Sequence, residues 1–258
     1  MSDSARLRLF QLVSPALPVG AFSYSEGLEV LVQSGRLPGV GPLQAWLEAE
    51  LLRGAVALEA AALAPLADLL RRWREAAADP AADAAASATA ARAALLELDG
   101  WLLAQREAPE LRAQQRQMGQ SLLQLLADLS FPLPSSAPAA PAAPAAPAMP
   151  VPPDSPMPPP LAWPAAFAWA GCCLELASPA IEEAYLYGWV ANQISAAVRL
   201  VPLGPTQGQR LQLALAPLIA DRAAALALAD PRELWSGGVG AGLAQLQHAE
   251  LYSRLFRS

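Results

Sequence analysis

The chain has 258 residues, 54% of them hydrophobic and 16% charged, which is enough to bury a substantial core in one large domain or two small ones. All 17 basic residues are arginine. The absence of lysine excludes a P-loop NTPase and Schiff-base catalysis, and the net charge of −6 argues against broad nucleic-acid binding.

Residue types that are typical of metal sites and disulfide frameworks are scarce. Cys172 and Cys173 are adjacent and cannot join distant segments, and His248 is the only histidine, so we expect no stably bound metal or cofactor. The apolar run at residues 9–13 is too short for a signal peptide, and prolines interrupt the uncharged stretch at residues 155–174. We therefore expect a cytoplasmic chain.

The first distinctive segment is SPALPVGAFSYSEGLE, residues 14–29, called the opening segment below. It lies between two predicted short helices at residues 5–13 and 26–34. Pro15, Pro18 and Gly20 predict a bend, and Ser23 or Ser25 is a candidate N-cap for the second helix.

Two functional interpretations of the opening segment are possible. A serine hydrolase built on Ser25 would need a glycine two residues earlier, where Ser23 stands, and a strand before the turn, with His248 as the base. Neither the glycine nor the strand is present. The pattern therefore favours a preformed recognition loop.

Helical patterns dominate the rest of the chain. Helices are predicted from residue 43 onward, with a kink or restart at Pro65, then at residues 95–103 and 111–129, and again from residue 163 to the end. No convincing run alternates apolar and polar residues as a strand would. We predict an all-α fold, a single-domain multi-helix bundle.

One stretch differs in composition from these helices. Fourteen of the 26 prolines lie between residues 132 and 164, among repeated PAA units, which favours an extended, disordered insertion. We therefore divide the single domain into an N-terminal helical half (1–131), a Pro/Ala-rich insertion (132–160) and a C-terminal helical half with a partner-docking tail (161–258).

The predicted helix at residues 181–201 has two different faces. Its core positions are Leu186, Val190, Ile194, Ala197 and Val201. Its opposite face holds Tyr185, Gly188, Asn192, Ala196 and Arg199. We expect this second face to meet solvent, either as ordinary surface or as a surface on which another chain packs.

Two further regions indicate contacts with a partner. Arg199 and Arg210 are the only charged residues between positions 184 and 220, which favours docking of an acidic partner.

The glycine-containing stretches at residues 202–209 and 237–242 follow no strand and predict turns between helices. The final residues 249–258, AELYSRLFRS, combine aromatic residues with arginines and predict a tail that becomes ordered on a partner.

Four stretches together resemble the urease accessory protein UreF family. They are the opening segment, RQMGQSLLQLL (116–126), NQISAAVRLVPLGPTQGQR (192–210) and YSRLFRS (252–258). The resemblance implies an all-α, homodimeric protein without catalytic activity, which bridges UreD (also called UreH) and the GTPase UreG. That complex loads nickel into apo-urease while the partner hydrolyses GTP. A helical adaptor of another assembly is the alternative interpretation.

The resemblance also implies which residues contact partners. Apart from His248, they come from the opening segment, the helix at residues 181–201, the turn after it and the tail. They are Tyr24, Glu26, Tyr185, Asn192, Arg199, Gly204, Gln207, Gly208, Gln209, His248, Tyr252, Arg254, Leu255, Phe256, Arg257 and Ser258. The chain departs from the family pattern at Pro205, where glutamine is expected, and at Gln247, where arginine is common.

Overall fold

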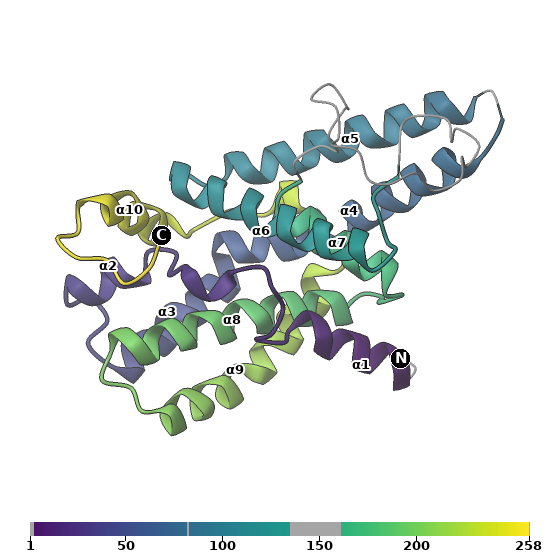
Figure 1. Ribbon diagram of the computed structural model, residues 1–258. Helices are drawn as coiled ribbons and strands as arrows, with labels where there is room; N and C mark the ends of the chain where they lie inside the picture. The colour runs from purple at the N-terminus through teal and green to yellow at the C-terminus, as the bar shows by residue number, and fades with distance from the viewer. Residues whose placement is uncertain (1–2, 82, 135–160, 258) are drawn as a thin grey trace, which may run out of the picture.

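The computed structural model describes residues 3–81, 83–134 and 161–257. Every regular element in these residues is helical, which confirms the predicted all-α fold (Figure 1). The elements are α1 (Asp3–Leu12), η1 (Ala21–Ser23), α2 (Leu28–Gln33), α3 (Val40–Arg53), α4 (Ala55–Ala78), α5 (Ala84–Ala104), α6 (Pro109–Asp128), α7 (Trp163–Cys173), α8 (Ala180–Leu200), α9 (Pro205–Leu226), η2 (Pro231–Glu233), α10 (Val239–Gln247) and η3 (His248–Glu250). The predicted insertion lies outside the described residues from residue 135 to residue 160.

Helix α4 forms the centre of the bundle. It packs against α5 and α7 on one side and against α3, α8 and α9 on the other (Figure 1). Residues 56–63 are all buried, because neighbouring helices surround this part of α4. Alanine and leucine suit this position, since both favour helix and alanine lets neighbouring helices approach closely. Glu59 is buried with the others but is the one charged residue among residues 56–63.

The break between α3 and α4 lies at Gly54; the predicted restart of the helix at Pro65 is wrong, whereas a kink there stays a prediction. Helix α4 continues through Pro65, whereas Gly54 has an extended backbone with φ −80° and ψ 176°. A Cβ atom at Gly54 would collide with the Glu50 side chain and backbone, so only glycine fits this junction.

The opening segment folds back between α1 and α2, as the predicted bend requires. Helix α2 begins at Leu28 rather than at residue 26, because Glu26 and Gly27 both have left-handed backbones, with φ 50° and 87°. The prediction that Ser23 or Ser25 caps α2 is therefore wrong: Gly27 takes the N-cap position, without a side-chain cap.

The chain returns from the insertion at a well-anchored point. The backbone N–H of Ala162 donates to both carboxylate oxygens of Asp99 on α5, at 3.0 and 3.3 Å. Gly119 on α6 faces the same segment, and a Cβ atom there would lie 2.3 Å from Leu161 O. Before the insertion, Phe131 O accepts a hydrogen bond from Trp169 Nε1 on α7 at 3.1 Å. Both flanks of the insertion are thus attached to the helical body.

Among the described residues, no helix combines the length and the apolar character that crossing a membrane requires.

Candidate functional site

A buried ion cluster of Glu26, Glu59 and Arg106 lies where the opening segment meets α4 and the end of α5. All three side chains are buried. Arg106 Nε donates to Glu59 Oε1 at 2.8 Å, and Arg106 Nη1 lies 3.5 Å from Glu26 Oε2. One arginine therefore joins a carboxylate of the opening segment to a carboxylate in the middle of α4.

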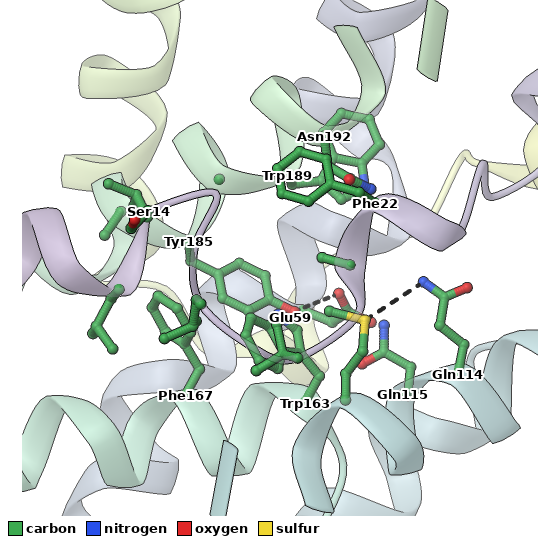
Figure 2. Close-up of a pocket in the computed structure, with 18 of the residues that line it drawn as sticks. Ser14, Phe22, Glu59, Gln114, Gln115, Trp163, Phe167, Tyr185, Trp189 and Asn192 are labelled. Atoms are coloured by element: carbon green, nitrogen blue, oxygen red, sulfur yellow. Dashed lines mark hydrogen bonds between the residues drawn. The ribbon is translucent and has the colours of Figure 1, made fainter. Parts of the chain in front are cut away.

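Uncharged side chains complete the hydrogen bonding of both carboxylates. Glu59 Oε2 accepts from the Tyr185 hydroxyl at 2.8 Å (Figure 2). Glu26 accepts from Gln114 Nε2 on α6 at 2.9 Å and from Trp189 Nε1 on α8 at 3.1 Å. Hydrogen bonds of this kind offset the cost of removing a carboxylate from water. The cluster consequently holds the opening segment, α4, α6 and α8 together.

Burial and charge determine the protonation states in this region. Burial alone would lower the pKa of Arg106, but the carboxylates of Glu59 and Glu26 raise that pKa above its usual range, so the arginine is charged. Burial raises the pKa of the Tyr185 hydroxyl, and the charge of Glu59 raises it further, so Tyr185 remains a donor. Burial also raises the pKa of Glu50, at the end of α3, to about 7, although Arg106 opposes this shift. Glu50 therefore titrates near neutral pH.

A cavity of about 80 Å³ lies beside the ion cluster (Figure 2). Ser14 and Phe22 of the opening segment line one side of it, and the rest is lined by side chains of α6, α7 and α8, with Leu12 of α1 and Glu59 of α4. The buried atoms Gln115 Oε1 and Asn192 Oδ1 have no hydrogen-bond partner within the described parts of the chain. The same parts contain no group of three or more His, Cys, Asp or Glu side chains that could hold a metal ion.

The prediction that Tyr185 and Asn192 face solvent is wrong. Both are buried: Tyr185 lies against Glu59 on α4 and Phe167 on α7, and Asn192 lies against the opening segment. Asn192 Nδ2 donates to the backbone oxygen of Tyr24 at 3.5 Å, and the buried Tyr24 donates its hydroxyl to Gln117 Oε1 at 3.0 Å. Among the polar members of this face, Arg199 is exposed. Partner contacts of the buried residues stay a prediction.

A second cluster surrounds the carboxylate of Glu29 on α2. This tail clamp consists of Glu29, His248 and residues 251–257. Glu29 Oε1 accepts from the backbone N–H of Leu255 at 2.7 Å, and Oε2 accepts from that of Phe256 at 3.2 Å. His248 Nε2 lies 3.1 Å from Oε2. The tail, which we predicted to become ordered on a partner, is thus already ordered on its own chain.

Two further contacts join the tail to the rest of the molecule. The guanidinium carbon of Arg199 lies 4.7 Å from the centre of the buried Phe256 ring, and the backbone N–H of Arg257 donates to Ser23 O at 2.9 Å. Arg199, Arg254 and Arg257 are exposed and form what we call the basic surface. Tyr252 and Leu255 are exposed beside it. Ser258 lies outside the described residues.

A turn at residues 201–204 joins α8 to α9, as the glycine-containing stretch at residues 202–209 predicted in part, because residues 205–209 already form the first turn of α9. Gly204 N donates to Gln207 Oε1 at 3.0 Å, and the side chains of Gln207 and Gln209 are exposed. Gly208 is buried, and a Cβ atom there would lie 3.1 Å from Ile194 Cγ2. This glycine therefore allows α8 and α9 to pack closely.

The structure does not support a catalytic serine or a reactive cysteine. Ser25 is fully buried, and His248 is engaged with Glu29. Cys172 and Cys173 are half-buried, and burial raises the pKa of both thiols, that of Cys173 to about 12. Both thiols are therefore protonated at neutral pH, which makes them poor nucleophiles.

Our sequence predictions missed Glu29, Glu59 and Arg106 as site residues. Glu59 had a detectable signal, because it is the only charged residue in the apolar run AVALEAAALA. Arg106 stands among polar residues at a helix end, and nothing in its local sequence distinguishes it. Glu29 has no local signal either, since its partners lie more than 200 positions away in the chain.

Comparison with known proteins gives consistent matches over the whole chain. The family model described as UreF matches residues 40–216. Urease accessory protein UreF of Synechocystis sp. is 38% identical over 265 residues, covering 100% of both chains. The proteins of the same name from Nostoc sp. and Alkalilimnicola ehrlichii are also 38% identical, covering 100% and 98% of this chain and 98% and 96% of their own.

Proposed function

Because the chain belongs to the UreF family of urease accessory proteins, we propose that it is the adaptor that bridges UreD (also called UreH) and the GTPase UreG. Family membership makes it an accessory protein rather than an enzyme. In this proposal nickel is the cargo that the assembled complex delivers to apo-urease, and the partner GTPase hydrolyses the GTP. We assign this assembly to the cytoplasm.

The basic surface is the observation that best supports an adaptor role. The overall charge of the protein is −6, yet Arg199, Arg254 and Arg257 gather at one end of α8 through the contact between Arg199 and Phe256. Exposed aromatic and apolar side chains, Tyr252 and Leu255, accompany them. Arginine and tyrosine beside apolar groups are enriched in protein–protein interfaces, and the positive charge favours an acidic partner.

Homodimer formation is the second part of the proposal. A groove of about 350 Å³ between α1, α8 and α9 is lined by Phe10, Val13, Tyr187 and Ile219, among others. Phe10 and Tyr187 are exposed, as is Leu213 on α9. Neighbouring exposed apolar side chains support a contact with a second copy. Replacing Phe10 with serine should lower the mass measured by light scattering from dimer to monomer; an unchanged dimer would place the contact elsewhere.

Co-purification tests the adaptor role directly. The full chain, co-expressed with UreD and UreG, should bring down both proteins, and the complex should activate apo-urease when nickel and GTP are supplied. Deleting residues 251–258 should abolish UreD binding and leave the far-UV circular dichroism nearly unchanged. Shortening residues 137–159 is the matched control, and it should leave activation intact. A full-length chain that binds neither partner would refute the proposal.

The basic surface has its own test. The Arg254→Glu and Arg257→Glu variants should weaken UreD binding, and the loss should shrink as salt is added, because salt screens exposed charges. Arg92→Glu on α5 makes the same charge change away from the tail and should bind as the unmodified chain does. Equal losses in all three variants would show that overall charge, rather than this surface, controls binding.

A further inference from the structure

We propose that Glu29 is a positioning residue that holds the C-terminal tail in a preformed shape, and that the partner recognises the tail in this shape. The second half of the statement rests on the proposed function, because it concerns the partner that the tail binds. The first half concerns this chain alone.

The Glu29 carboxylate is saturated by donors that include the tail backbone. It is 1% exposed, and its partners are Leu255 N, Phe256 N, His248 Nε2 and, at 3.4 Å, Gln33 Nε2. Hydrogen bonds to a buried carboxylate are stronger than those between neutral groups. A buried charge that depends on the tail for two donors therefore favours the closed tail strongly over a detached one.

Neighbouring contacts fix the same stretch at further points. Gln33 Nε2 also donates to Ser253 O at 3.3 Å, and Arg257 N donates to Ser23 O. The Phe256 ring is buried against Arg199. Residues 253–257 are consequently held through their backbone and one side chain.

This arrangement leaves the recognition side chains available to a partner. Tyr252 is fully exposed, Leu255 is 49% exposed, and Arg254 and Arg257 also face solvent. Because the clamp engages backbone groups and buries only the side chain of Phe256, the other side chains of residues 252–257 stay accessible to a partner. Holding a segment in its bound shape reduces the conformational entropy lost on binding, so the clamp should raise affinity.

Amide hydrogen exchange of the free, full-length protein tests the clamp without any partner. Leu255, Phe256 and Arg257 should exchange more slowly than residues 252–254. In Glu29→Gln, one carboxylate oxygen becomes an NH₂ group that faces a backbone N–H donor, so protection should be lost at Leu255 or Phe256, whichever amide meets that group. Glu250→Gln, an exposed glutamate just before the tail, makes the same charge change and should retain the protection. Equal exchange in the wild type across residues 252–257, or unchanged protection in Glu29→Gln, would overturn the clamp.

Binding to purified UreD tests the display of the tail. Glu29→Gln should bind roughly tenfold more weakly than the wild type, with unchanged circular dichroism, since at least one charged hydrogen bond is lost. Phe256→Ala leaves Glu29 intact and should also weaken binding. Tighter binding by Glu29→Gln would overturn the display, because it would mean that the clamp withholds the tail. A wild-type chain that ignores UreD would refute the proposed function, while the exchange pattern would still decide the clamp.

Discussion

Replacing Glu50 with glutamine should stabilise the protein, and the gain should increase with pH. Glu50 lies near the end of α3, buried beside Gly54 and Gly238, which leave room for its carboxylate. Burial raises its pKa from 4.5 to about 7, against the opposing charge of Arg106. Glutamine has nearly the same shape and stays neutral at every pH, so the substitution removes the ionisation and little else.

The sign of the effect follows from proton linkage. The folded state binds the Glu50 proton more tightly than the unfolded state does, because the folded pKa is the higher of the two. The stability that protonated Glu50 contributes is therefore fully present below pH 4.5 and is lost as the pH rises through about 7. The loss amounts to about 3 kcal/mol once Glu50 is fully ionised. The glutamine variant avoids this loss.

Urea unfolding followed by circular dichroism at several pH values measures the effect. The difference in unfolding free energy between Glu50→Gln and the wild type should grow by roughly 2 kcal/mol between pH 5 and pH 8. Because only the difference is interpreted, other titrating groups, including Asp99, cancel. A difference that stays constant over this range, or that falls with increasing pH, would refute the assignment of a raised pKa to Glu50.

Three further substitutions test the interior. Arg106→Met should lower the free energy of unfolding by about 3–5 kcal/mol, because it leaves the Glu59 carboxylate buried without its counter-charge. Urea unfolding at pH 7 measures this loss. A loss below about 1 kcal/mol would contradict the prediction. Gly119→Ala should cost about 2 kcal/mol, because its Cβ atom would collide with Leu161 O. Gly100→Ala on α5 is its control; nothing lies within 4 Å of its Cβ position, so it should add roughly 0.5–1 kcal/mol.

Helical periodicity predicted the inner face of α8 correctly. Leu186, Val190, Ile194, Ala197 and Val201 are all buried. Spacing along one helix determines which residues share a face, and the most apolar face is the one that turns to the core. The same information was insufficient for the opposite face, because the residues that contact it come from other elements: Tyr24 contacts Asn192, and Glu59 contacts Tyr185.

The two clusters show the same division between local and long-range information. The opening segment was correctly predicted to bend, since proline and glycine act locally. Its role in holding the tail depends on Glu29 contacting residues 248–256, which no local pattern reports. The tail composition indicated a binding segment, but composition does not reveal that the first surface it meets belongs to its own chain. Composition and spacing thus identified the segments, and only the fold could pair them.

The anchoring of Phe131 and Ala162 has a consequence for how this protein can vary or be engineered. Trp169 fixes the chain before the Pro/Ala-rich segment, and Asp99 fixes it afterwards, through contacts that use no residue of the segment itself. The Pro/Ala-rich composition predicts a flexible connection, and doubling the length of such a connection costs only about 0.6 kcal/mol in closure entropy. The segment can therefore lengthen or shorten between relatives at small thermodynamic cost. It is also a suitable position for inserting a fluorescent reporter domain or an affinity tag without disturbing the ion cluster or the tail clamp.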